Sequence, residues 1–220
     1  MEAIDTLEPG IKRKSELEIL SDDLVSLFER VIPAELRTRT YPVDVVSVAS
    51  GPFVKELAAV YSTIPNIRKF RAIDQGIPSG LLRIMNEDNS RYPGFQLENG
   101  DVADPAVLGQ AVYDVAILRN PQIASLSGGP EVNPVWTKIM NNTLSCVKEG
   151  GFLIMSGHTE DEFHRSMEFV QRSRTGFEVI SREDPIKPQF TSRFPLVERS
   201  VAVLRKGYGG VQVKSRVSTF

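Results

Sequence analysis

Apolar positions along the chain follow two alternating periods. Between residues 15 and 32 they recur every three or four positions, which predicts an amphipathic helix that ends before Pro33. Further along, short apolar runs that are typical of buried strands alternate with stretches of helical spacing. The predicted strands cover residues 43–49, 68–74, 95–98, 113–119, 151–156, 177–182 and 200–204. The predicted helices between them cover residues 52–62, 78–86, 104–112, 134–147 and 159–172.

This alternation predicts an α/β fold, a doubly wound and mostly parallel seven-stranded sheet with helices on both faces. The last two strands break the pattern because the segment between them, residues 183–197, contains Pro185, Pro188 and Pro195 and has no helical face. Without a crossover helix, these two strands are expected to form a C-terminal antiparallel hairpin.

Local signals mark several ends of these elements. Asp104 is a predicted N-cap, and Thr159 with Glu162 forms a predicted capping box. Gly150 is expected to take the left-handed conformation that closes the helix before it, and Gly151 to let the chain turn back into the sheet.

Composition narrows the class of protein. The chain has 220 residues, 41% hydrophobic, with 26 basic and 28 acidic side chains and a formal net charge of −2. This balance does not indicate nucleic acid as a partner, although it leaves room for a local basic patch. Because the chain has one cysteine, Cys146, it cannot form an intramolecular disulfide. Its first residues lack the pattern of a secretion signal, and no apolar run in the sequence is long enough to cross a membrane. We therefore expect a cytoplasmic protein with no membrane partner.

The most informative stretch is residues 43–55, V-D-V-V-S-V-A-S-G-P-F-V-K. An apolar strand ends in small residues and Gly51, and a helical pattern follows. Unpaired backbone N–H groups at such a turn can face a polar ligand. Asp74 ends the next apolar run, where a doubly wound sheet holds the two hydroxyls of a ribose. The two features together predict a cofactor that contains a nucleoside.

The order of elements from residue 15 to 206 resembles the class I S-adenosylmethionine-dependent methyltransferases. Residues 45–53 stand where that family has its glycine-rich motif, and Asp74 where an acid binds the ribose. Asn99-Gly100-Asp101 resembles the motif whose acid contacts the adenine amino group. Residues 113–118 resemble the fourth strand, and V-K-E-G-G-F-L over 147–153 resembles the segment that leads into the fifth.

The resemblance has departures in the glycine-rich motif. Ser47 stands where the family has an acid, Ala49 at the first glycine and Phe53 at the third, so that only Gly51 remains. Ser47 can donate a hydrogen bond but cannot form an ion pair with the ammonium group of the cofactor.

The resemblance implies S-adenosyl-L-methionine as cofactor and identifies candidate site residues. The predicted cofactor-binding residues are Ala49, Ser50, Gly51, Asp74, Gln75, Asp101, Val102 and Arg119. Asn120 and Pro121 are predicted to contact the substrate, because an Asn-Pro pair at this position is a partial match to enzymes that methylate amide or amino nitrogens. Asp101 has an alternative role as a cap of the following helix, and Asn120-Pro121 has one as a proline-stiffened loop. No catalytic residue and no metal site are predicted.

The sequence therefore predicts a methyltransferase acting on an unidentified small-molecule or macromolecular acceptor. The alternatives are a binding or scaffold protein that has the fold without the cofactor and, less favoured, a nicotinamide-dependent oxidoreductase, whose G-x-G-x-x-G turn the chain lacks. Residues 1–14 are expected to form an N-terminal extension, 15–206 the methyltransferase-like Rossmann domain, and 207–220 a C-terminal tail.

Overall fold

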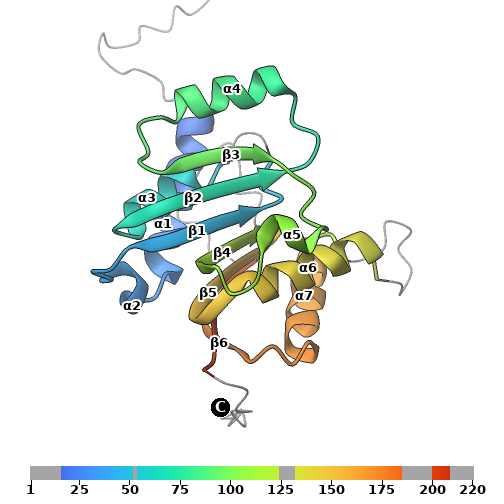
Figure 1. The fold of residues 1–220 in the computed structure, drawn as a ribbon. Coiled ribbons are helices and arrows are strands. Elements are labelled where there is room, and N and C mark those ends of the chain that lie inside the picture. The colour runs from blue at the N-terminus through green and yellow to red at the C-terminus, as the bar shows by residue number, and fades with distance from the viewer. Residues whose placement is uncertain (1–15, 52–53, 124–131, 185–199, 209–220) are drawn as a thin grey trace, which may run out of the picture.

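The computed structural model describes residues 16–51, 54–123, 132–184 and 200–208 (Figure 1). The predicted N-terminal extension, most of the predicted loop over 183–197 and most of the predicted tail lie outside these residues. The helices are α1 (Glu16–Val31), α2 (Ala34–Arg37), α3 (Leu57–Thr63), α4 (Ser79–Asp88), α5 (Pro105–Leu108), α6 (Pro134–Cys146) and α7 (Glu160–Arg172). The strands are β1 (Val43–Val48), β2 (Ile67–Asp74), β3 (Phe95–Asn99), β4 (Tyr113–Arg119), β5 (Val147–Gly157), β6 (Phe177–Glu183) and β7 (Ser200–Lys206).

The seven strands form one sheet in the order β3-β2-β1-β4-β5-β7-β6. The pairs among β1 to β5 are parallel, whereas β7 is antiparallel to both β5 and β6. The chain order reverses between β1 and β4, which is the switch point where ligands bind in open α/β sheets. The predicted fold class is confirmed, including the C-terminal antiparallel hairpin.

Two apolar layers cover the sheet. One layer packs the buried faces of α1 and α3 against alternate residues of β1 and β4, among them Val45 and Ile117. The other packs α6 and α7 against the opposite face, through residues such as Val46 and Leu118. Because both faces are covered, every residue of β1 is buried, as expected for a central parallel strand. None of the described helices has the length and apolar character that spanning a membrane requires.

Two helices are shorter than their sequence patterns predict. The helix predicted over 104–112 ends at Leu108, because Gly109 takes a positive φ of 75° and turns the chain toward β4. Asp104 is its N-cap, as predicted, and accepts the Ala106 N–H. The helix predicted from residue 52 begins only at Leu57, after Val54 takes a positive φ of 37° and the chain turns.

Gly150 has the predicted left-handed φ, 71°, but it does not close a helix. Helix α6 ends at Cys146, and Gly150 lies in an irregular part of β5, where Val147 pairs with Tyr113 and Phe152 with Val115. A Cβ on Gly151 would lie 2.9 Å from the Asp114 carbonyl oxygen, so β4 can approach only a glycine here. The two glycines therefore form a bulge rather than a helix cap.

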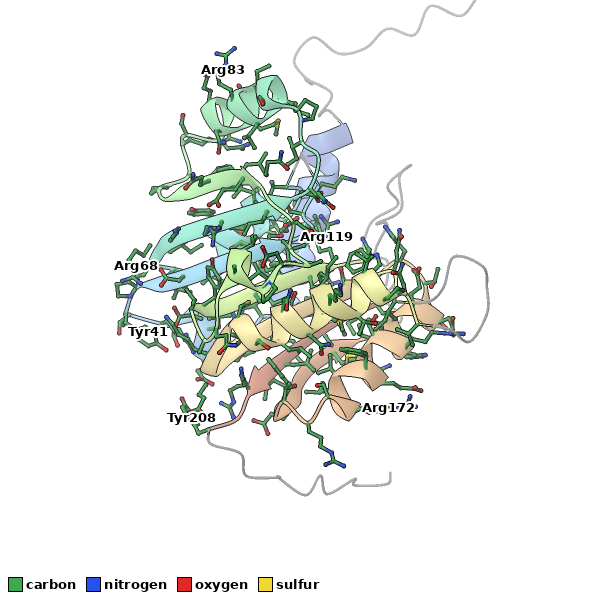
Figure 2. All side chains as sticks on the ribbon, turned by 45° about the vertical axis from the view of Figure 1, so that its right-hand side comes forward. Tyr41, Arg68, Arg83, Arg119, Arg172 and Tyr208 are labelled. Carbon is green, nitrogen blue, oxygen red and sulfur yellow. The ribbon has the colours of Figure 1, made fainter. Side chains whose placement is uncertain are left out.

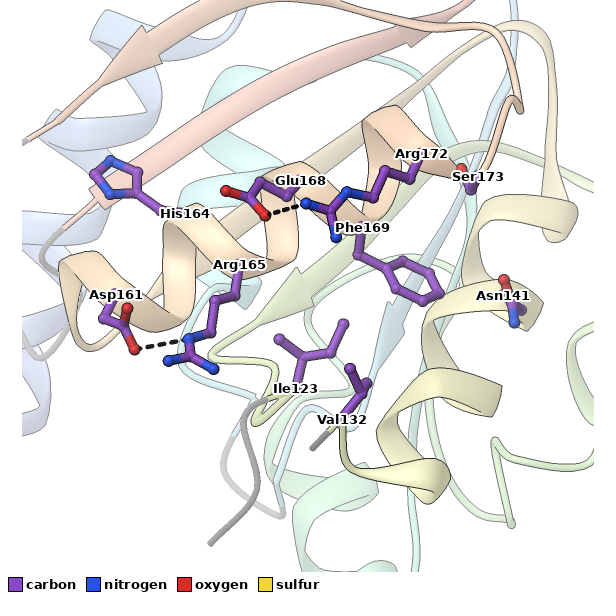
Figure 3. A pocket seen from close by; sticks show the side chains of 10 residues that line it. All are labelled: Ile123, Val132, Asn141, Asp161, His164, Arg165, Glu168, Phe169, Arg172 and Ser173. Carbon is purple, nitrogen blue, oxygen red and sulfur yellow. Dashed lines mark hydrogen bonds and ion pairs between the residues drawn. The ribbon is translucent and has the colours of Figure 1, made fainter. Parts of the chain in front are cut away.

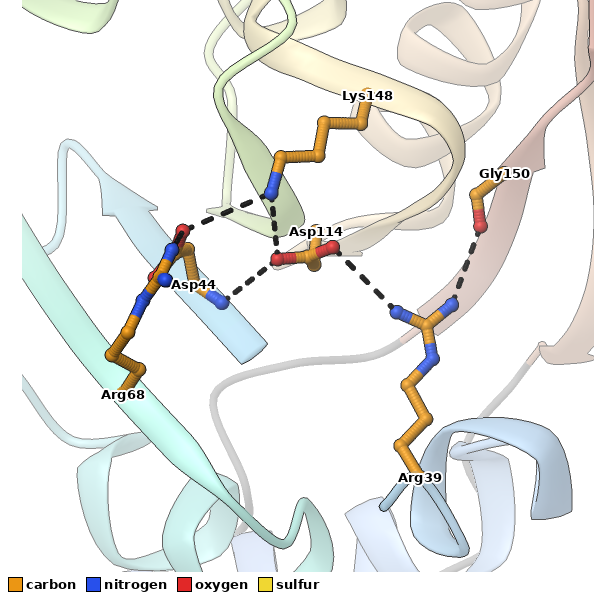
Figure 4. A network of polar contacts seen from close by, with 6 residues as sticks. All are labelled: Arg39, Asp44, Arg68, Asp114, Lys148 and Gly150. Atoms are coloured by element: carbon orange, nitrogen blue, oxygen red, sulfur yellow. Dashed lines mark hydrogen bonds and ion pairs between the residues drawn. The ribbon is translucent and has the colours of Figure 1, made fainter. Parts of the chain in front are cut away.

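A cluster of charges joins the strands at the edge where they begin (Figure 4). The Asp114 carboxylate accepts hydrogen bonds from the Lys148 ammonium at 3.0 Å and from the Asp44 backbone N–H at 2.9 Å. The hydrogen bond from Arg68 lowers the pKa of Asp44. Arg39 spans from Asp114 to the carbonyl of Gly150. This cluster lies at the opposite edge from the candidate site, and Figure 2 shows the separation between Arg68 and Arg119.

Candidate functional site

The candidate site lies at the edge where the parallel strands end. The register aligns Val48 of β1 with both Ile73 and Leu118, so the residues that follow β1, β2 and β4 emerge side by side. Asp74 and Asn99, the last residues of β2 and β3, are also aligned. The predicted cofactor residues that follow these strands therefore share one edge.

The turn after β1 exposes its backbone through two left-handed residues. Ala49 has a φ of 53° and Gly51 a φ of 70°. A Cβ built on Gly51 would meet no atom of the described residues within 4 Å, so they leave the space beside this residue open. A ligand can therefore approach the main chain of Gly51 closely, which a larger side chain at this position would obstruct.

Asp74 binds the Gly51 turn directly. Its Oδ2 accepts the Gly51 backbone N–H at 2.6 Å, and its Oδ1 accepts the Gln75 N–H at 2.6 Å. Since an ionised carboxylate offers about four acceptor positions, both oxygens keep capacity for a further donor such as a hydroxyl. Asp74 thus connects the ends of β1 and β2 and still presents an anionic acceptor at this edge.

Asp101 reaches the same edge from β3. The residue before it, Gly100, donates its N–H to the Asp74 carbonyl at 3.0 Å. The exposed Asp101 carboxylate accepts the Ala103 N–H at 3.0 Å and so closes a turn, whereas the cap of α5 is Asp104. The neighbouring Val102 is only 4% exposed and packs in the apolar layer between the sheet and helices α6 and α7, the α6-side core. Most of its side chain is therefore turned away from a ligand at the edge.

The predicted substrate residues follow β4. Asn120 has a φ of 53° and donates its N–H to the Ser156 carbonyl at 2.8 Å. Its side-chain Oδ1 is buried and has no hydrogen-bond partner among the described residues, which is costly for a polar atom. Pro121 is buried. Of the pair, Asn120 is therefore the residue with unused hydrogen-bonding capacity.

Sequence reasoning missed one charged residue at this edge. Glu56, just before α3, is fully buried, and its Oε2 accepts the Arg119 Nη1–H at 2.9 Å. Its Oε1 accepts the hydroxyl of Ser47. The sequence signal for Glu56 is weak: it is an acid that directly precedes the apolar positions of α3. Ser47 stands where the resemblance leads one to expect an acid on the strand. The Glu56 carboxylate, which comes from the start of α3, therefore lies beside that position.

A separate cavity lies in a groove between α6 and α7 (Figure 3). Its volume is about 820 Å³, and Ile123, Val132 and Phe169 form its apolar part. On α7, Arg165 pairs with Asp161 and Arg172 with Glu168 along its wall, each at 2.9 Å. None of the predicted cofactor residues lines this groove. Within the described residues, no three or more His, Cys, Asp or Glu side chains form a group that could hold a metal ion.

Comparison with known proteins identifies the fold. No protein-family model and no curated protein matches the sequence. Among solved structures, the N-methyltransferase NodS from Bradyrhizobium japonicum WM9 aligns with a TM-score of 0.55 at 9% identity, over 86% of this chain and 97% of NodS. NodS has also been solved in complex with S-adenosyl-L-homocysteine.

Two further structures align over most of both chains. An rRNA methylase from Streptococcus thermophilus has a TM-score of 0.51 at 14% identity, over 90% of this chain and 99% of the methylase. Precorrin-6y C5,15-methyltransferase from Geobacter metallireducens GS-15 has a TM-score of 0.50 at 13% identity, over 83% of this chain and 86% of that enzyme. Strand order, the reversed last strand and these alignments agree: the chain has the fold of the class I S-adenosylmethionine-dependent methyltransferases.

Proposed function

We propose that this protein is a methyltransferase that uses S-adenosyl-L-methionine. The observation that carries the proposal is the meeting of the open Gly51 turn, the Asp74 carboxylate and Asp101 at one edge of the sheet. This set matches an adenosine group because a ribose offers two hydroxyl donors and an adenine offers an amino donor, and both require acceptors.

Each residue has a separate part in the proposed binding. Asp74 accepts the ribose hydroxyls with the lone pairs that Gly51 and Gln75 leave unused. Asp101 accepts from the adenine amino group, and the Gly51 main chain lies against the body of the cofactor. When bound, the cofactor supplies a methyl group on a sulfonium for direct transfer. The protein's contribution is then to orient the two reactants and exclude water, which needs little acid–base chemistry.

The acceptor is proposed to lie beside Asn120. Within the described part of the chain the buried Asn120 Oδ1 has no hydrogen-bond partner, and an N–H donor on the acceptor would satisfy it. The solved relatives include enzymes named for small-molecule and for RNA substrates, so they favour neither class of acceptor. We propose a cytoplasmic location, in keeping with the one buried, unpaired cysteine of the described chain, Cys146.

Calorimetric titration tests the proposal. S-adenosylmethionine and its demethylated product are expected to bind with dissociation constants in the micromolar range, whereas NADH, which the oxidoreductase alternative requires, is expected not to bind. Absence of heat with both adenosyl ligands at millimolar concentration would count decisively against a methyltransferase.

A binding or scaffold protein without cofactor is the second candidate. It is favoured by the two backbone donors that Asp74 already accepts and by the buried Glu56–Arg119 ion pair at the ends of β1 and β4. A scaffold would need these contacts for rigidity alone. It predicts no adenosyl binding and no loss of any ligand affinity when Asp74 is replaced, so the titration separates the two candidates.

A further inference from the structure

A buried ion pair joins the start of α3 to the end of β4. The Glu56 carboxylate is 0% exposed and accepts the Arg119 Nη1–H at 2.9 Å through Oε2. The Ser47 hydroxyl, from β1, donates to Oε1. Glu56 is therefore held from two neighbouring strands, β1 and β4, that both end at the candidate site.

Stability alone does not explain this arrangement. Moving a carboxylate and a guanidinium out of water is costly, and their mutual attraction repays the cost only in part. Apolar residues of similar volume commonly give an equally stable core. The charges at Glu56 and Arg119 are therefore not needed for packing.

Access to the pair is one-sided. The Arg119 side chain keeps 11% of its surface exposed, whereas Glu56 keeps none. Two polar atoms on residues next to Arg119 in the chain or the sheet, the Asn120 Oδ1 and the Ser156 Oγ, are buried and lack hydrogen-bond partners in the residues that the structure describes. Ser156 is aligned with Arg119 across β4 and β5. Of the two charged side chains, only that of Arg119 therefore reaches solvent.

The chemistry of the proposed cofactor supplies a group of matching charge. Besides adenine and ribose, S-adenosylmethionine carries an amino-acid carboxylate. Asp74 and Asp101 are anionic and would repel it, whereas the planar guanidinium of Arg119 suits a carboxylate. Arg119 lies one residue beyond the Val48–Leu118 pair, level with the turn that contains Gly51.

We infer that Arg119 binds the carboxylate of the cofactor's amino-acid part, and that Glu56 is the positioning residue that fixes the Arg119 guanidinium for this contact. The inference rests on the proposed function. The inference deepens the proposed function, because it divides the site into an adenosine end at Asp74 and Asp101 and a carboxylate end at Arg119. Glu56 acts through Arg119, and Ser47 acts through Glu56.

The test compares two ligands that differ only in the carboxylate, S-adenosylhomocysteine and its decarboxylated analogue, by calorimetric titration. The wild-type protein is expected to bind S-adenosylhomocysteine about tenfold or more tightly, the usual value of a charge-assisted contact. Glu56→Gln keeps the side-chain shape and removes the charge, and is expected to reduce this ratio to about threefold or less. Affinity for the decarboxylated analogue should stay close to that of the wild type.

Two further variants separate positioning from a general structural effect. Ser47→Ala leaves both charges in place and loosens Glu56, so it tests the same contact if Glu56→Gln does not fold. It is expected to lower the ratio as well. Asp44→Asn removes another buried, Arg-paired carboxylate from the opposite end of β1, and should leave the ratio unchanged.

The outcomes distinguish the inference from the function on which it rests. A wild-type ratio near one, or an unchanged ratio in both Glu56→Gln and Ser47→Ala, overturns the inference while adenosyl binding stands. Absence of binding by both ligands to the wild-type protein overturns the proposed function and this inference with it.

Discussion

The carboxylate of Asp74 accepts the backbone N–H of Gly51 at 2.6 Å, across 23 positions of sequence. This contact joins the turn after β1 to the end of β2, and it places the open side of Gly51 next to an anionic acceptor. A single side chain therefore fixes the shape of the proposed adenosine end of the site.

Replacement of Asp74 by Asn is expected to weaken both binding and folding. An amide presents one acceptor and one donor, so its NH₂ group would face one of the two backbone N–H groups that Asp74 accepts. Affinity for S-adenosylhomocysteine should fall about tenfold or more, and the free energy of unfolding by about 1–3 kcal/mol. Titration and urea unfolding measure the two effects. Asp88→Asn, at an exposed position of α4, is the control and should change neither.

Gly51 and Gly176 allow a matched pair of substitutions. Both have a positive φ, 70° and 74°, and a Cβ on either would meet no atom within 4 Å. Gly51→Ala and Gly176→Ala should therefore each lower the free energy of unfolding by about 1–2 kcal/mol, the cost of a left-handed L-residue. Only Gly51→Ala should reduce S-adenosylhomocysteine affinity, because its new methyl group enters the proposed site. Equal affinities of the two variants would place the ligand away from Gly51.

Asp184 should make the protein sensitive to acid. Burial alone would raise its pKa, but hydrogen bonds from Ser200, Arg182 and His164 outweigh burial and lower the pKa to about 2. A carboxyl group with a lowered folded-state pKa stabilises the protein above its unfolded value of about 4, and this contribution is lost as the pH falls toward 2.

The Asp184→Asn variant checks this pH dependence. At pH 7 it should be less stable than the wild type by about 1–2 kcal/mol, and the difference should shrink between about pH 4 and pH 2. Urea unfolding across that range measures it. A stability difference that stays constant down to pH 2 would contradict the assignment.

Cys146 is expected to be chemically inert in the folded protein. It is 0% exposed, and burial raises the pKa of its thiol to about 12. At pH 8 the thiol is therefore protonated and shielded, so reaction with a disulfide reagent should follow the rate of unfolding. In urea one thiol per chain should react at once. Rapid reaction without denaturant would show that the α6-side core is open.

Periodicity, together with the prolines of residues 183–197 for the last hairpin, was enough to predict the sheet. The strand predicted over 113–119 has those bounds in the structure. Its four consecutive apolar residues, 115–118, stand between Asp114 and Arg119 and give a clear local signal. The helix predicted over 104–112 was too long, since the positive φ of Gly109 ends it after one turn. A glycine inside a helical pattern gives only a weak local signal, and the turn toward β4 decided the outcome.

The candidate site was only partly visible in the sequence. Asp74 and Gly51 were predicted from local pattern at strand ends, and the structure brings them together because parallel strands end at one edge. Glu56 was missed because its meeting with Arg119, 63 positions away, depends on how α3 packs against the sheet. Likewise, the burial of Val102 follows from packing against α6 and not from its position after β3.

A crystal structure grown with S-adenosylhomocysteine tests the central claim most directly. The account predicts density for the ligand at the edge where β1, β2 and β4 end, with the ribose hydroxyls within hydrogen-bond distance of the Asp74 carboxylate and the main chain of Gly51 against the ligand. Ligand density in the groove between α6 and α7, or an edge filled by the protein's own side chains at saturating ligand, would contradict it.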